Sequence, residues 1–215
     1  KDGETVEALA VRDGNIVATG DRKSLEAFRG PKTEVVNLAG RTLMPGFVDG
    51  HSHFTASAAM VDVVNVSSPP AGPMRNYDDI VEALSARIQA NSIPPGEIVL
   101  GWGYDDSLLE ERSHPTRDVL DRASTDHPIV IAHVSGHLAA ANSAGLELYG
   151  FSAETPDPPG GVIRRIEGSN EPNGVLEETA AQKMFHSLGQ GDVERKIDQL
   201  VRGQQGVLSQ GITTV

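Results

Sequence analysis

The stretch that decides the fold is residues 43–54, which read LMPGFVDGHSHF. Its proline–glycine pair predicts a turn, and the two apolar residues that follow predict the start of a buried strand. Because side chains alternate between the faces of a strand, Asp49, His51 and His53 are expected on one face. Neutral imidazole is a common ligand of zinc and similar metals. A bare pair of histidines often binds nothing, but a polar cluster on an apolar strand is costly without a neutralising partner, so the context favours a metal site.

The composition narrows the classes of partner. The chain has 215 residues, 18 Lys+Arg against 30 Asp+Glu, a formal net charge of −12 and no cysteine. Without cysteine there is no disulfide framework, thiol nucleophile or thiolate metal site, so a bound metal must be held by histidine and carboxylate. The acidic balance argues against nucleic acid and anionic membranes as partners, whereas small neutral or polar substrates are left open.

The two ends of the chain suggest a fragment. It begins without methionine and stops at Val215, inside a predicted strand. Neither an apolar run of about 18 residues nor a charged and apolar leader is visible, so we expect a cytoplasmic protein without a membrane span or signal peptide.

Residues 1–45 read as a small β-rich unit. Strands are predicted over residues 6–11 and 15–19, joined by a tight turn at Asp13-Gly14. A short helix is predicted over residues 24–28, followed by strands over 34–38 and 42–44.

From Phe47 onward, predicted strands and helices alternate. Asn76 is expected to cap a helix, and Thr116 another. Strands are predicted near residues 98–100, 128–132 and 162–167, the second of them buried, and further helices near 143–149, 176–184 and 197–208. This alternation favours an α/β fold with a parallel sheet.

Two further residues are candidate substrate contacts. His137 follows a predicted strand and Gly136, which could place it at the mouth of a site; capping of the next helix is an equal alternative. Trp102 lies between two glycines and could form the wall of an apolar subsite, although simple packing is the more common role of a lone tryptophan.

The remaining polar residues have simpler interpretations. Arg164 and Arg165 could bind a carboxylate, but neighbouring strand residues face opposite ways and one should be solvated. Glu177 is expected at the start of a helix, where the helix dipole favours it without any catalytic role. We predict structural or exposed positions for His114, His127 and His186, and a solvated face for the acidic pairs Asp105-Asp106 and Glu110-Glu111.

Taken together, residues 43–54 resemble the first barrel strand of the amidohydrolase superfamily. The hairpin at residues 14–20 is similar to one in the β-sandwich of those enzymes. An ordered set of downstream motifs resembles amidohydrolase family 3, the branch similar to N-substituted formamide deformylases: residues 101–105, 114–117, 127–130, 136–137 with 142–143, 160–161 and 174–177.

The resemblance implies a metal-dependent hydrolase on a TIM barrel. Residues 1–45 would be part of the β-sandwich, and 46–215 the N-terminal part of the barrel, with an insertion at about 60–205. His51 and His53 would bind one or two divalent ions, with zinc the leading candidate. The family's other ligands, a lysine, two histidines and a catalytic aspartate, would lie beyond this chain, which we therefore expect to be inactive alone.

The implied reaction is hydrolysis of a C–N bond other than a peptide bond, in a small N-acyl or N-formyl amide. Two alternatives are a deaminase or cyclic amidohydrolase on the same fold, and a non-catalytic scaffold that has lost the metal. A homo-oligomer is compatible with any of these.

Overall fold

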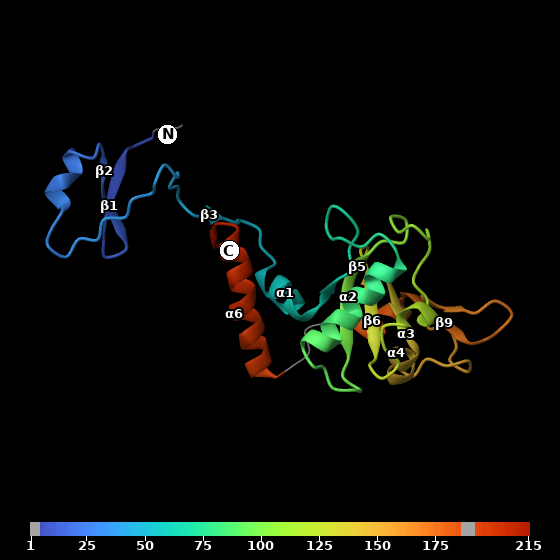
Figure 1. Cartoon of the computed structure of the whole chain (residues 1–215). Coiled ribbons are helices and arrows are strands. Elements are labelled where there is room, and N and C mark those ends of the chain that lie inside the picture. The colour runs from blue at the N-terminus through green and yellow to red at the C-terminus, as the bar shows by residue number, and fades with distance from the viewer. Residues whose placement is uncertain (1–4, 186–191) are drawn as a thin grey trace. The chain divides into compact units, whose positions relative to one another are not determined.

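The computed structural model describes residues 5–185 and 192–215, so His186 lies outside the described residues. The chain divides into two compact units, Lys1–Pro45 and Gly46–Val215 (Figure 1). Among the described residues, no helix combines the length and the apolar character that crossing a membrane would require.

The first unit is built on one hairpin. Strands β1 (Ala8–Arg12) and β2 (Asn15–Gly20) pair antiparallel, and η1 (Ser24–Phe28) is a 3-10 helix. The turn residues Asp13 and Gly14 both have positive φ, 51° and 77°, as the tight turn requires. The strands predicted over residues 34–38 and 42–44 are wrong, since neither segment pairs with the hairpin and Val35, Val36, Leu43 and Met44 are exposed.

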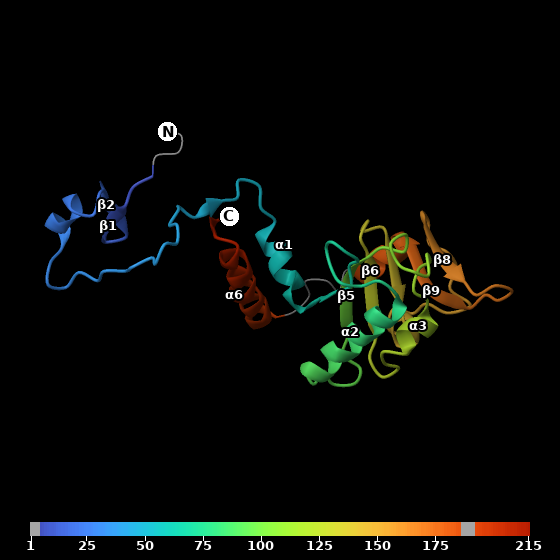
Figure 2. The ribbon, with the colours of Figure 1, turned by 45° about the horizontal axis from the view of Figure 1, so that its top comes forward.

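The second unit brings together two segments that are distant in the sequence. One holds β3 (Phe47–Val48), α1 (Phe54–Ala59) and η2 (Met60–Asp62); the other holds α6 (Val193–Ser209) and β10 (Ile212–Thr214). Strands β3 and β10 pair in parallel, with Phe47 opposite Ile212. Figures 1 and 2 show α1 and α6 side by side.

The rest of this unit is a six-stranded mixed sheet in the order β4-β5-β6-β7-β9-β8. Its strands are β4 (Val64–Asn65), β5 (Val99–Tyr104), β6 (Ile129–His133), β7 (Leu138–Ala141), β8 (Gly161–Arg165) and β9 (Pro172–Glu178). Its helices are α2 (Tyr77–Ala90), α3 (Arg117–Asp121), α4 (Ser143–Leu148) and α5 (Thr179–Phe185).

The α/β class is confirmed, but only half of this sheet is parallel. Strands β4, β5 and β6 run parallel, whereas β7, β8 and β9 pair antiparallel. The reason is loop length: residues 134–137 between β6 and β7 are too few for the crossover of a dozen or more residues that a parallel neighbour needs.

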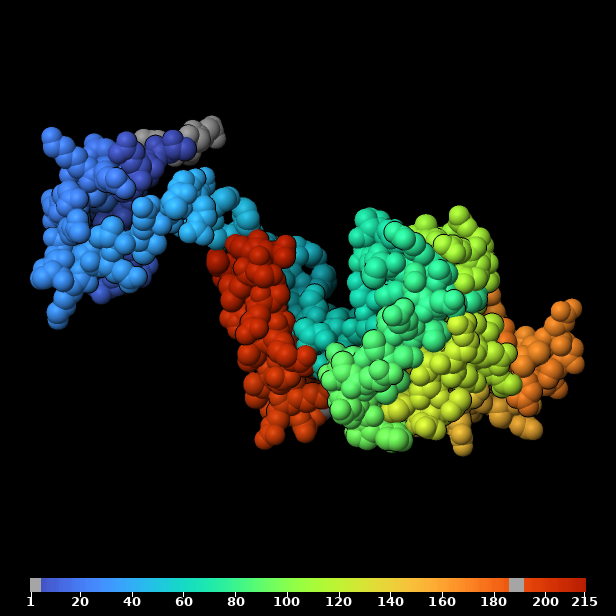
Figure 3. Space-filling model, viewed as in Figure 1, coloured from blue at the N-terminus to red at the C-terminus, as the bar shows by residue number. Residues whose placement is uncertain are grey.

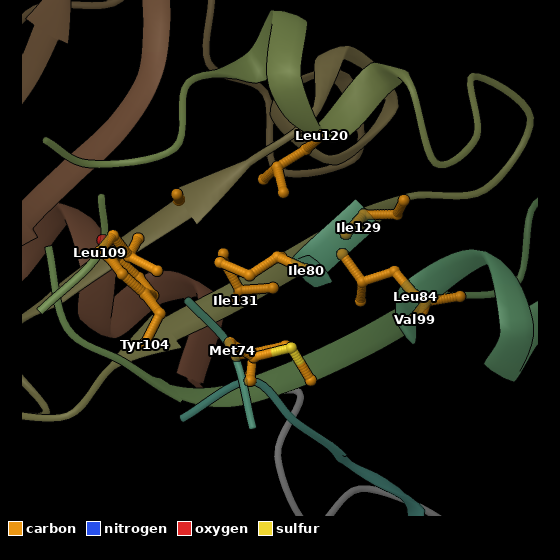
Figure 4. Close-up of a cluster of buried hydrophobic side chains, with 11 residues drawn as sticks. Met74, Ile80, Leu84, Val99, Tyr104, Leu109, Leu120, Ile129 and Ile131 are labelled. Atoms are coloured by element: carbon orange, nitrogen blue, oxygen red, sulfur yellow. The ribbon is translucent and has the colours of Figure 1, made fainter. Parts of the chain in front are cut away.

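Both faces of the sheet are buried. On β6, Ile129 and Ile131 belong to one apolar cluster, to which α2 and α3 contribute, and Val130 belongs to a second, to which α4 and α5 contribute. Figure 4 shows the first cluster, where Ile80 and Leu84 of α2 lie beside the β6 side chains. The sheet is therefore a rigid platform for residues at the ends of its strands.

Helix starts follow local sequence. The Asn76 side chain accepts a hydrogen bond from the Asp79 backbone N–H at 3.0 Å, which confirms the predicted cap of α2. Thr116 precedes α3 as predicted, but its side chain makes no capping hydrogen bond.

Candidate metal centre

The two histidines of the opening motif lie just after β3, in the loop that leads to α1. The strand predicted to carry them is shorter than expected: β3 covers only Phe47 and Val48, and the last hydrogen bond to β10 comes from the Asp49 N–H. Phe47 and Val48 are 52% and 71% exposed, so the prediction of a buried strand start is also wrong.

The loop nevertheless brings the histidines together. The ring centroids of His51 and His53 are 5.1 Å apart and their planes are nearly perpendicular, at 78°. Asp49 holds the start of this loop through two hydrogen bonds. Its backbone N–H donates to the Thr214 carbonyl of β10 at 2.9 Å, and its Oδ1 accepts from the His51 N–H at 3.1 Å.

The donor chemistry of this pair fits a divalent metal. Two exposed imidazoles at this separation can bind a common ion, and neutral imidazole suits zinc. A catalytic zinc centre needs about three protein ligands, so this pair would be one part of such a centre.

His137 and Trp102 are placed by the six-stranded sheet. His137 lies just before β7, with its Nδ1 3.0 Å from Glu178 Oε2, and it remains largely exposed. Since a strand and not a helix follows it, His137 caps no helix. Trp102 is half-buried on β5, with its ring 6.4 Å from that of Phe185. A substrate contact at either residue stays a prediction.

Arg164, Arg165 and Glu177 form hydrogen bonds with other residues of this chain. Arg164 Nε donates to Glu177 Oε1 at 2.5 Å, and Arg165 donates to the carbonyls of Ser152 and Thr155. The prediction that Glu177 begins a helix is wrong, because β9 continues to Glu178 through its pairing with β8.

The structure also places a polar cluster at the carboxyl ends of β5 and β6. Asp106 Oδ1 lies 3.1 Å from Nε2 of His133, a residue that the sequence analysis did not single out. The prediction of a solvated face fails for Asp106, whose side chain is only 30% exposed. His133 comes directly after the strand predicted at residues 128–132, but Asp106 lies six residues beyond the strand predicted near 98–100. The two meet because β5 continues to Tyr104 and pairs in parallel with β6, whose carboxyl end lies at the same edge.

Burial and hydrogen bonding shift the pKa values of three groups at this cluster. Burial lowers the pKa of His114 despite the nearby Asp106 charge, which favours the neutral ring. Burial raises the pKa of Tyr104, whose hydroxyl lies 3.2 Å from His114 Nδ1. The Ser107 hydroxyl, 2.6 Å from Asp105 Oδ1, lowers the pKa of that carboxyl.

The other polar candidates have local roles. His127 is buried between the Ser124 hydroxyl and the Ile93 carbonyl, at 2.7 and 3.0 Å, which is a structural position as predicted. Glu111 Oε1 accepts from the Tyr77 backbone N–H at 2.9 Å, at the start of α2, and Glu110 is exposed.

Comparison with known proteins identifies relatives along the whole chain. The chain is 32% identical over 213 residues to an N-substituted formamide deformylase of Arthrobacter pascens. This match covers 97% of this chain and 38% of that protein. It is 28% identical over 209 residues to Protein LONG AFTER FAR-RED 3 of Arabidopsis thaliana, covering 97% of this chain and 34% of that protein. The chain therefore spans little more than a third of the length of these relatives.

The fold is shared with a solved structure, that of an uncharacterized metal-dependent hydrolase from Pyrococcus furiosus. The TM-score is 0.61 at 21% identity, and the match covers 96% of this chain and 39% of the other. The model of the amidohydrolase family matches residues 34–215. This match spans most of the sequence and includes the paired histidines after β3, and the chain belongs to the amidohydrolase family.

Proposed function

We propose that this chain is part of a metal-dependent hydrolase that cleaves C–N bonds other than peptide bonds, with a small N-acyl or N-formyl amide as substrate. The observation that carries the proposal is the convergence of His51 and His53, with ring centroids 5.1 Å apart, in a member of the amidohydrolase family. The 32% identity to an N-substituted formamide deformylase supports the choice of substrate class.

In this proposal His51 and His53 hold the metal, with zinc as the leading candidate, together with ligands from outside this chain. A bound divalent ion of this kind polarises a carbonyl and lowers the pKa of water toward neutrality. The contribution of Asp49 is to hold the loop, because its carboxylate accepts the His51 N–H while its own N–H is anchored on β10.

We also propose that β3 and β10 are the first two strands of a TIM barrel. Their parallel pairing supports this, and so does the position of the histidines after the carboxyl end of β3, where barrel enzymes place their sites. In this arrangement residues at about 60–205 are an insertion between the two strands, and residues 1–45 are part of a β-sandwich.

In a complete barrel, neighbouring strands and helices would cover the apolar side chains of β3 and α6. Val48, Ile197 and Val201 are each at least half exposed, and Figure 3 shows the surface of α6 in red. In the complete protein, amides of β3 should exchange hydrogen for deuterium more slowly than in this chain alone. Equal exchange rates in the two proteins would contradict the barrel arrangement.

The function is tested in the complete protein by replacing His51 and His53 with alanine. Metal content at this centre and hydrolysis of an N-formyl amide should both be lost, with activity falling at least about 1000-fold because the ion supplies several kcal/mol of transition-state stabilisation. Ser52→Ala, which changes the residue between them, is the matched control and should retain both. Retention of metal and activity in the double variant would refute the proposal.

The products distinguish the alternative reactions. A deformylase releases formate, a deaminase releases ammonia, and a cyclic amidohydrolase opens a ring without releasing either. A protein that binds the metal at His51 and His53 yet turns over none of these substrates would be a scaffold. This chain alone should turn over none of them, since His51 and His53 are only two of the ligands that the proposed catalytic centre needs.

A further inference from the structure

A second cluster of metal-binding side chains lies at the carboxyl edge of β5 and β6. These strands run parallel, and Tyr104 at the end of β5 is paired with His133 at the end of β6. Asp105 and Asp106 follow Tyr104 directly, so the pairing brings both carboxylates beside the His133 ring. On its other side β6 has the antiparallel neighbour β7. The cluster thus lies where the sheet changes direction, at the strand ends that commonly bind ligands in α/β proteins.

The donor atoms are close enough to share one ion. One ligand atom from each of Asp105, Asp106 and His133 lies within 4.8 Å of the other two. The separation of His133 Nε2 from Asp106 Oδ1 is 3.1 Å. Neighbouring ligands of a tetrahedral zinc ion with bonds of 2.0–2.2 Å are about 3.3–3.6 Å apart, so this pair needs to separate by only a few tenths of an ångström to hold one ion.

The second ring nitrogen of His133 also has a suitable partner. Its Nδ1 lies 2.8 Å from the Ser135 hydroxyl. Nε2–H donates to Asp106, and Nδ1 accepts from the Ser135 backbone N–H at 3.1 Å. Ligation through Nε2 would move the proton to Nδ1, which would give up the bond from the Ser135 N–H and donate to the Ser135 hydroxyl oxygen, as metal-binding histidines do to their outer partners.

The surroundings favour a cation at this position. Two adjacent carboxylates carry two negative charges, and the Asp106 and His133 side chains are mostly buried, at 30% and 12% exposed. His114 approaches the same Asp106 oxygen, with Nδ1 3.6 Å from Asp106 Oδ1 and 3.2 Å from the Tyr104 hydroxyl. The rings of His114 and Tyr104 pack beside that of His133, with centroids 5.9 and 5.1 Å from it.

We propose that Asp105, Asp106 and His133 form a second divalent-metal site, separate from the His51 and His53 centre and independent of the proposed function. Two carboxylate oxygens and one imidazole nitrogen suit zinc and neighbouring first-row ions such as cobalt or manganese. Three protein ligands leave a coordination position open to water or to a ligand group.

The test uses the complete protein with His51→Ala and His53→Ala, which removes the two ligands that this chain gives to the first centre. This protein is stripped with a chelator and titrated with Co²⁺, whose visible absorption reports ligation, and the Co²⁺ is then displaced with Zn²⁺. One ion should bind per chain. Adding Asp106→Asn and His133→Ala should weaken binding by more than about 100-fold, and Ser135→Ala by about 10-fold.

Two further variants test the site even if the protein with Asp106→Asn and His133→Ala unfolds. Asp105→Asn removes a charge but leaves an oxygen to accept from the Ser107 N–H, so the turn should persist while Co²⁺ affinity falls at least 10-fold. Glu110→Gln, at an exposed acid nearby, is the matched control and should bind as the parent does. No Co²⁺ uptake by the parent, or equal affinity in Asp105→Asn and Glu110→Gln, would overturn the site. Neither result bears on whether His51 and His53 support hydrolysis.

Discussion

At the scale of single residues, Asn142 shows how one buried amide can organise several loops. It is fully buried, and its Oδ1 accepts from the backbone N–H groups of Ile129 and Gly145, both at 2.8 Å. Its Nδ2 donates to the carbonyls of Ser124 and His127 at 2.8 and 2.9 Å. The helix predicted from residue 143 locates this cap in the sequence, but its contacts with β6 depend on the fold.

Replacing Asn142 with alanine should destabilise the protein by about 2–4 kcal/mol, because two buried N–H groups and two carbonyls lose their partner. Urea unfolding followed by circular dichroism measures this. Asn91→Ala, at an exposed position after α2, should change the free energy of unfolding by less than about 0.5 kcal/mol. Similar effects of the two substitutions would show that the Asn142 hydrogen bonds contribute little.

At this scale, the amino-acid sequence predicts correctly those features that depend on residues close together in the chain. The turn at Asp13-Gly14 and the cap at Asn76 depend on neighbours within a few positions, and both are confirmed. The sequence does not predict the contact of His133 with Asp106, which are 27 positions apart and meet because β5 and β6 pair in parallel. A histidine at the end of a strand carries no pattern of its own that would distinguish it.

At the scale of elements, α6 contains two glycines with opposite roles. A Cβ at Gly203 would lie 2.7 Å from Ala58 Cβ and 2.9 Å from Ala58 Cα, so the close packing of α6 on α1 requires glycine there. A Cβ at Gly206 would meet no atom within 4 Å. The spacing of apolar residues predicts the helix but does not indicate which glycine faces α1.

These glycines give a matched pair of substitutions. Gly206→Ala should stabilise the protein by about 0.5–1 kcal/mol, because alanine favours helix and no neighbour opposes the methyl group. Gly203→Ala should instead destabilise it by about 1–3 kcal/mol, since α1 and α6 must move apart. Thermal unfolding of the two variants compares them directly. Stabilisation by both would contradict the close contact of the helices.

At the scale of the whole second unit, Asp62 joins segments that are far apart in the chain. Its carboxylate accepts from Gln199 at 2.9 Å and from Arg202 at 2.8 Å, both on α6. Arg87 of α2 donates to its backbone carbonyl at 3.0 Å. Burial by itself would raise the pKa of Asp62, but the hydrogen bonds from Arg202 and Gln199 and the charges of Arg202 and Arg195 hold it below its ordinary value.

This pKa has a defined consequence for stability. Because the folded pKa lies below the unfolded value, the contribution of Asp62 is fully present above the unfolded pKa and is lost as the pH falls through the folded pKa. Asp62→Asn should therefore destabilise the protein by about 1.5–3 kcal/mol at pH 7 and by less in acid. Asp198→Asn, at a carboxylate that is 60% exposed and pairs with Arg202 of the same helix, is the control and should cost under about 1 kcal/mol. An Asp62→Asn effect that is independent of pH would refute this assignment.

The sequence by itself determined the family, the α/β class, the turn at Asp13-Gly14, the cap at Asn76, and the spacing that brings His51 and His53 together. Each of these depends on residues close together in the chain, where covalent geometry and hydrogen-bonding preference act directly. Only the tertiary structure decided that β3 is two residues long, that half of the six-stranded sheet is antiparallel, and that His133 meets Asp106. These features depend on which strands become neighbours, and strand pairing is settled by the competition among distant segments for backbone hydrogen bonds and apolar burial.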